Sequence, residues 1–222
     1  MCCRYYIDKT EYSHSIYLQA LESGLEVPLE KPLVTYGEVY PLDTTPVLAA
    51  SARTHTIAAH PMQWGIMGSD KKRPLLNARV ETAAVKPTFR DLWAAHRCIV
   101  PCSWYFEWTH PDGEKGVKYV MQPNGADRTF LCGLYRITGR SGEVVILTRA
   151  ASESAAAIHD RMPLMLSEKD IEAWVDPTAS SKALNDLSKR AITEVVYSKA
   201  GPEEDRNKLR TNAKGEFIFG WG

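Results

Sequence analysis

The first residues of the chain, "MCCRYY", offer the first candidate for chemistry. Removal of Met1, which a small second residue permits, would leave Cys2 at the N-terminus with an α-amine and a thiol on neighbouring carbon atoms. An α-amine has a reference pKa of about 7.7 to 8.0, so a substantial fraction is unprotonated near neutral pH, unlike a lysine amine. The sequence therefore predicts a 1,2-aminothiol, which only an N-terminal cysteine can supply.

A second candidate is the acid in "SWYFEWT". In an extended strand, alternation places Trp104, Phe106 and Trp108 on one face and Tyr105 and Glu107 on the other. Glu107 then lies either on the solvent side of a half-buried sheet or inside a cavity lined by the second face. The alternation alone favours the solvent side.

Two further stretches combine a polar side chain with arginine. "IHDRMP" places His159 and Arg161 just before a Met-Pro break, hence in a loop or at a helix end, where a histidine is more often a cap or a surface residue than a catalyst. In "LLNARVETA", Asn77, Arg79 and Glu81 share one face if the stretch is extended. Singly, neither stretch identifies a site.

Cysteine and histidine spacing raises the question of zinc. The five cysteines are an odd number, which argues against a disulfide framework and for a reducing compartment. His96, Cys98 and Cys102 fall close together, but no second His/Cys pair completes a tetrahedral set. We therefore favour buried cysteines on one face of a strand, and we expect neither metal nor other cofactor.

Charge and hydropathy limit the partners. The 27 basic residues balance the 27 acidic ones, so any binding to nucleic acid must come from a local patch such as "DKKRP" or the scattered arginines. A charge run alone more often marks a solvated loop. No apolar run approaches the length of a membrane span, and no secretion signal is recognisable. We expect a cytoplasmic protein without membrane contact.

The elements that must position these residues indicate an α+β fold. A helix is predicted from a capping pair at Asp8 and Glu11 to Gly24, and another at "PTFRDLWAAH", with Pro87 at its first position. "RCIVPCSWYFEW" is predicted as a strand, "IEAWV" and "SKALNDLSKR" as helices, and "ITEVVYSKA" as the last strand. Because strands and helices do not alternate regularly, we predict one domain over residues 1–222, with a mixed or antiparallel, barrel-like sheet flanked by a few helices.

Taken together, five blocks resemble the SOS response-associated peptidase (SRAP) family, the proteins that shield abasic sites. They are "MCxR" at the N-terminus, "WG" at 64–65, "NARVET" at 77–82, "WYFEW" at 104–108 and "IHDRMP" at 158–163. Their order and spacing match the family, whereas the residues after Pro177 contribute little. The resemblance implies a monomeric sensor of abasic sites in single-stranded DNA, active in DNA repair and in the SOS response, which acts in the cytoplasm at the nucleoid.

The resemblance also implies roles for single residues. The Cys2 amine would form an imine with the ring-opened aldehyde of an abasic site, and the tethered thiol would close a thiazolidine, giving a covalent protein–DNA link. Asn77 would orient the amine, Glu107 would relay protons, and His159 would assist opening of the sugar ring. This is a lyase-like crosslinking activity, with peptidase-type processing of the protein's own N-terminus as a companion reaction.

By the same resemblance, four residues would contact DNA. Arg79 and Arg161 would bind flanking phosphates, with Arg4 a weaker candidate, and Trp64 of the "WG" block completes the group. Two departures from the family concern this surface. Cys3 stands where the family usually has glycine, and "WGIMGSDKKRP" lacks the second tryptophan that would stack on a base.

Two other classes of function stay open. Cys2 with a histidine and an asparagine also fits a thiol peptidase. Acetylation of the amine would separate the two classes, because it abolishes crosslinking and spares a thiol-only hydrolase. A non-covalent reader of modified DNA would need neither Cys2 nor Glu107.

Overall fold

The computed structural model describes residues 3–51, 56–68, 73–109 and 116–201, together with the backbone of 209–211 and 217–219. Cys2 and residues 69–72 of the basic run lie outside these ranges. The strands are β1 (Arg4–Ile7), β2 (Leu33–Val39), β3 (Thr44–Ala50), β4 (Ile57–Trp64), β5 (Ile66–Met67), β6 (Pro74–Leu75), β7 (Asn77–Arg79), β8 (Arg97–Cys102), β9 (Trp104–Trp108), β10 (Lys118–Pro123), β11 (Thr129–Thr138), β12 (Ser141–Ala150), β13 (Arg161–Pro163), β14 (Val195–Lys199), β15 (Leu209–Thr211) and β16 (Phe217–Phe219). The helices are α1 (Glu11–Glu22), α2 (Val80–Ala83), α3 (Arg90–Ala95), α4 (Glu153–Ala156), the 3-10 helix η1 (Glu168–Asp170), α5 (Ile171–Val175) and α6 (Ser181–Lys189).

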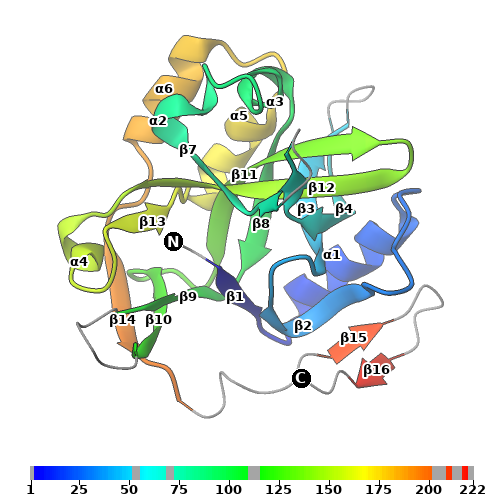
Figure 1. Cartoon of the computed structure of the whole chain (residues 1–222), viewed down its shortest axis with the longest axis horizontal. Helices are drawn as coiled ribbons and strands as arrows, with labels where there is room; N and C mark the ends of the chain where they lie inside the picture. Colours follow the sequence, from blue (N-terminus) through cyan, green and yellow to red (C-terminus); the bar gives the residue numbers. More distant parts are fainter. Residues whose placement is uncertain are drawn as a thin grey trace.

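Five strands close a mixed barrel at the centre of the molecule (Figure 1). The ring runs β3–β4–β12–β11–β8 and returns to β3. Neighbours in the ring are antiparallel except β4 and β12, which are parallel. Closure leaves the ring without a free edge, and the predicted α+β class with a barrel-like core is confirmed.

A second run of strands, β2–β1–β9–β10–β14, extends from the barrel through the parallel pair β2 and β3. Within this run all neighbours are antiparallel. On the other side of the barrel, β12 also pairs with β7 and β13. The strands that carry Asn77, Glu107 and Arg161 are β7, β9 and β13, and Figure 1 shows them around the beginning of β1.

Two apolar clusters fill the inside and the outside of the barrel. Alternation along β8 sends Cys98, Val100 and Cys102 into one cluster and Ile99 into the other, so the two cysteines share a face as predicted. The outer cluster is completed by α3, α5 and α6, which Figure 1 shows together on one side of the barrel. β8 is therefore buried on both faces.

Two helix starts differ from prediction. α1 is capped by Thr10, not by Asp8: Thr10 Oγ1 accepts from the Ser13 N–H at 3.1 Å, and Ser13 Oγ accepts from the Thr10 N–H at 3.0 Å. The Asp8 side chain instead accepts from the N–H of the next residue. α3 begins at Arg90 and not at Pro87, because residues 84–89 form turns before it.

The stretch predicted as one strand at "RCIVPCSWYFEW" is two. Ser103 separates β8 from β9, where its N–H donates to the Tyr6 carbonyl at 2.8 Å and its Oγ accepts from the Asp8 N–H at 2.9 Å. These contacts lead the chain out of the barrel and set β9 beside β1, with Tyr105 opposite Tyr5. The break at Ser103 therefore brings Glu107 to the N-terminal strand.

Candidate functional site

Glu107 is buried between β1 and β10, and 2% of its surface is exposed. The prediction that it lies on the solvent side is wrong, because β9 pairs on both edges and its second face is covered. Burial, with a small contribution from the charge of Asp160, raises the pKa of the Glu107 carboxyl to about 7. A carboxyl with this pKa can both donate and accept a proton near neutral pH.

Cys3 lies next to Glu107. Arg4 is opposite Phe106 in the β1–β9 pair, so continuing the register by one residue sets Cys3 beside Glu107. The pKa of the half-buried Cys3 thiol is raised, first by burial and then by the charge of Glu107. The residue that follows Cys2 in the chain therefore shares its surroundings with the buried acid.

Asn77 begins β7 and is held by two neighbours. It pairs with Ile146 of β12, and its Oδ1 is buried. The carbonyl of the preceding Leu76 accepts from the Ile146 N–H at 3.0 Å and from Trp64 Nε1 at 3.0 Å. These bonds fix the backbone immediately before Asn77.

Trp64 is a core residue of this arrangement. Only 1% of its surface is exposed, and its ring centroid lies 5.1 Å from that of Tyr5. In this structure the Trp64 ring has no surface to offer to a DNA base. Its indole N–H holds the carbonyl of Leu76, the residue before Asn77, a contact that the sequence did not suggest.

His159 lies between α4 and β13, with 17% of its side chain exposed. Its Nδ1 is 2.9 Å from the Arg161 N–H and 2.7 Å from a carboxylate oxygen of Asp160. One nitrogen cannot accept from the amide and donate to the carboxylate at once. The amide is fixed by β13, whereas the Asp160 side chain is 86% exposed and free to turn. The amide bond therefore assigns the proton of neutral His159 to Nε2.

Arg161 is engaged inside the protein. Its guanidinium donates to both carboxylate oxygens of Glu81, at 2.7 and 2.9 Å, and to the Thr148 carbonyl at 2.8 Å. The hydrogen bond from Arg161 lowers the pKa of Glu81 below its ordinary value. Contact of Arg161 with a phosphate stays a prediction, and it would require the guanidinium to leave Glu81.

The predicted common face of "NARVET" is wrong beyond Arg79. The chain leaves β7 at Arg79 and turns into α2, so Glu81 is on a helix and reaches Arg161. Arg79 itself is exposed. Of the predicted phosphate contacts, Arg79 is thus the one whose side chain faces solvent.

Arg4 belongs to a charge triad around the buried Glu38, which the sequence did not predict. Arg4 Nη1 lies 2.9 Å from Glu38 Oε1, and Lys118 Nζ lies 3.0 Å from Glu38 Oε2. The Arg4 guanidinium also lies 3.7 Å from the centroid of the Tyr40 ring. The carboxylate of Glu38 is fully buried and forms an ion pair with each of the two cations. The only sequence signal was an acid within an otherwise apolar strand.

The question of a zinc site concerned His96, Cys98 and Cys102. Burial raises the pKa of the Cys98 and Cys102 thiols, and among the described residues no group of three metal-binding side chains is found. No helix in the described ranges is long and apolar enough to cross a membrane.

Comparisons with known proteins agree on one family. The family profile described as "SOS response associated peptidase (SRAP)" matches residues 1–199. The abasic site processing protein YedK of Escherichia coli is 29% identical over 193 residues, covering 85% of each chain. The abasic site processing protein YobE of Bacillus subtilis is 30% identical over 126 residues, covering 52% of this chain and 58% of its own.

Solved structures share the fold. A protein from Bacteroides thetaiotaomicron superposes with a TM-score of 0.67 at 20% identity, covering 91% of this chain and 93% of its own. A phage-related protein from Bordetella bronchiseptica gives a TM-score of 0.69 at 16% identity, covering 90% and 94%.

Proposed function

The chain belongs to the SOS response associated peptidase family, and from this premise we propose that it processes abasic sites in single-stranded DNA. The relatives YedK and YobE carry the name abasic site processing protein. The proposed reaction is a covalent link through Cys2 after removal of Met1. The observation that carries it is the buried Glu107 carboxyl, with its pKa raised to about 7, beside the residue that follows Cys2.

The reaction proceeds in two steps, a condensation and then an intramolecular addition. The Cys2 amine adds to the C1′ aldehyde of the opened abasic sugar, and loss of water gives an imine. The thiol then adds across the C=N bond: sulfur bonds to C1′, and its proton passes to nitrogen. The tether between thiol and imine makes the second step intramolecular.

Glu107 supplies the protons that both steps need. In its neutral form the carboxyl protonates the departing hydroxyl, and the carboxylate left behind accepts the thiol proton and returns it to nitrogen. A carboxyl with a pKa near 4 would be almost wholly ionised at neutral pH and would lack the first function. Burial of β9 thus gives the Glu107 carboxyl a pKa that suits both proton transfers.

Asn77 and His159 serve the same reaction in the proposal. The Asn77 amide orients the Cys2 amine, because its backbone is fixed by the bonds to Leu76. His159 presents Nε2–H to the ring oxygen of the closed sugar and assists its opening. Arg79, exposed at the end of β7, binds a neighbouring phosphate. We place this function in the cytoplasm with a monomeric protein.

Intact-mass spectrometry tests the proposal. The purified protein is mixed with a single-stranded oligonucleotide bearing one abasic site. The expected product has the mass of the protein without Met1 plus the oligonucleotide, less one water. Cys2→Ala should give no adduct, whereas Cys3→Gly, which keeps the aminothiol, should give one. An adduct of equal yield in Cys2→Ala would refute the proposal.

Acetylated protein in the same assay distinguishes the crosslinking function from the thiol-peptidase function that the family description suggests. Acetylation of the α-amine should abolish the adduct if the amine attacks first. If the acetylated protein still cleaves a peptide substrate, the result would favour the hydrolase instead.

A further inference from the structure

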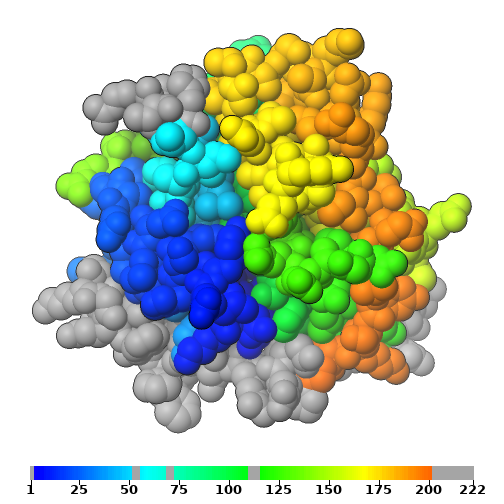
Figure 2. Space-filling view, turned by 180° about the vertical axis from the view of Figure 1, so that it is seen from behind, coloured from blue at the N-terminus to red at the C-terminus, as the bar shows by residue number. Residues whose placement is uncertain are grey.

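A pocket of about 700 Å³ lies at the far end of β1 from the candidate site. It opens between the first turns of α1, the β8–β9 break and the β10–β11 turn. The four residues of β1 separate it from Cys3 by roughly 13 Å. In Figure 2, which views the molecule from behind, the blue N-terminal residues and the green residues of this turn lie side by side.

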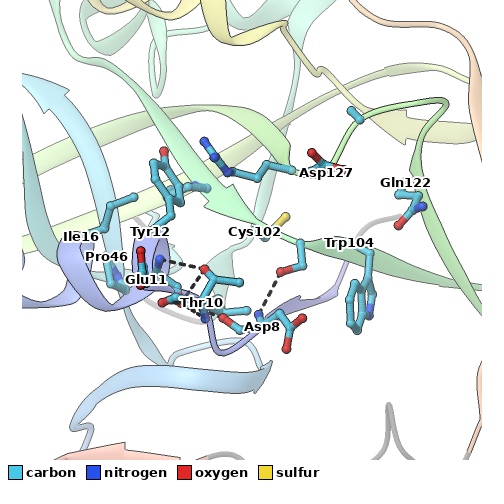
Figure 3. A pocket seen from close by; sticks show the side chains of 16 residues that line it. Asp8, Thr10, Glu11, Tyr12, Ile16, Pro46, Cys102, Trp104, Gln122 and Asp127 are labelled. Atoms are coloured by element: carbon cyan, nitrogen blue, oxygen red, sulfur yellow. Dashed lines mark hydrogen bonds between the residues drawn. The ribbon is translucent and has the colours of Figure 1, made fainter.

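The floor and side walls of the pocket are mainly apolar, although Ser103 and Gln122 also line it. Figure 3 shows Cys102 at its floor, with Tyr12, Ile16 and Pro46 on one side and Trp104 on the other. The Trp104 ring is held by stacking on Tyr6, at 4.6 Å between centroids and 6° between planes. The α1 wall is held by the capping box at Thr10. Both walls are therefore rigid before any ligand arrives.

The rim of the pocket is acidic. Asp8 and Glu11 stand on the α1 side and Asp127 stands across from them (Figure 3). All three are exposed, and none forms an ion pair within the described part of the chain.

The nearby cations do not cancel these charges. Arg128 also lines the pocket, but its guanidinium lies 4.1 Å from the Tyr12 ring centroid and its Nη1 lies 3.3 Å from Glu168 Oε1, so its charge is already paired. Lys9 lies 5.5 Å from the centroid of Tyr36. An acidic rim around an apolar floor repels the phosphates of nucleic acids and of anionic membranes, and it attracts cations.

We propose that this pocket is a docking site for a partner protein, which inserts a short segment with arginine or lysine beside an apolar side chain. The apolar side chain fills the floor over Cys102, and the cationic groups reach Asp8, Glu11 and Asp127 at the rim. The volume is within the range of about 300 to 1,000 Å³ of ligand pockets, and it exceeds what one cationic side chain needs. This site lies apart from the proposed DNA chemistry and would serve to bring the protein to other factors.

Fluorescence anisotropy with three peptide pools tests the proposal on the full chain. The dye-labelled, end-capped octapeptides share a central leucine pair and differ in the two residues beside it, which are arginine, glutamine or glutamate. The arginine pool should bind most tightly and the glutamate pool least, and the preference should shrink as salt rises. Equal binding of the three pools, a preference for glutamate, or no binding of the arginine pool would overturn the proposal.

Variants locate the binding. Glu11→Gln combined with Asp127→Asn should weaken the arginine pool about fivefold. The control removes two exposed carboxylates elsewhere, Glu153→Gln with Glu172→Gln, and should change nothing. Ala126→Phe should fill the pocket and remove binding of all pools. The DNA adduct should form equally in all these variants, so loss of one activity is distinguishable from loss of the other. Unchanged affinity in the first double variant would refute the site.

Discussion

Arg161 and Glu81 form a two-pronged ion pair, at 2.7 and 2.9 Å, that ties β13 to α2 across 80 residues of sequence. The pair joins the two strands that frame the site, since β7 precedes Glu81 and His159 precedes Arg161. The Arg161 side chain is 15% exposed, and its buried Nε has no hydrogen-bond partner within the described part of the chain. This arrangement is more typical of a residue that holds the site in place than of a residue that is available to bind phosphate.

A double-mutant cycle should measure this pair. Glu81→Gln, Arg161→Gln and the double variant should give a coupling of about 1 to 2 kcal/mol in the free energy of unfolding. The value is below that of a fully buried pair because Glu81 is 46% exposed. The more exposed pair Arg128 and Glu168 is the control and should give less than about 1 kcal/mol. Equal couplings would show that the two-pronged geometry adds nothing.

The pH dependence of stability should reveal Glu107. Its pKa is raised from 4.5 to about 7 in the folded chain, so the folded state binds the proton more tightly than the unfolded state. Stability is therefore highest below pH 4.5 for this group and falls as the pH rises to about 7. The loss amounts to about 3 kcal/mol at most. Urea unfolding at several pH values measures it.

Glu107→Gln should remove this pH dependence, because the amide is neutral at every pH. The variant should be more stable than the parent at pH 8 and should crosslink abasic DNA much more slowly. The exposed Glu153→Gln is the control and should keep the parent's profile. If Glu107→Gln unfolds with the parent's pH profile, the carboxyl does not titrate as described.

The buried Arg97 should be essential for the helical side of the barrel. It is almost fully buried, and its guanidinium donates to the carbonyls of Trp93, Trp174 and Asp176 at the ends of α3 and α5. Arg97→Lys offers one charged nitrogen in place of the planar fork and should lower the free energy of unfolding by roughly 3 kcal/mol. Thermal unfolding measures the loss, with the exposed Arg90→Lys as control. Equal melting temperatures would contradict the role.

The candidate site residues could be proposed from the sequence because they sit in short blocks. "WYFEW" drew attention to Glu107, and the block forms the strand β9 as its pattern predicts. The burial of Glu107 could not be predicted, since the break at Ser103 that turns β9 toward β1 depends on bonds to Tyr6 and Asp8, almost a hundred residues away. A local pattern carries no information about such a partner.

The same limit explains why the partners of the arginines could not be predicted from the sequence. Arg4, Arg79 and Arg161 look alike in sequence, and each is a candidate for phosphate. In the structure Arg4 pairs with Glu38 and Arg161 pairs with Glu81, both through long-range contacts, and Arg79 is the most exposed of the three. The burial of Trp64 could not be predicted for a similar reason, because the partner of its Nε1, the Leu76 carbonyl, is 12 residues away in the sequence.

Arg79 should therefore carry the phosphate contact that salt can detect. Each cation bound to single-stranded DNA contributes about 0.7 to the slope of log affinity against log salt concentration. Arg79→Gln should reduce the slope by about this amount and weaken binding to any sequence equally, because a phosphate contact carries no base information. Arg140→Gln, which removes an exposed arginine near Glu26, is the matched control and should leave the slope intact. Binding of an undamaged oligonucleotide to the Cys2→Ala protein isolates this contact from the covalent step, and an unchanged slope in Arg79→Gln would exclude Arg79 from the DNA-binding surface.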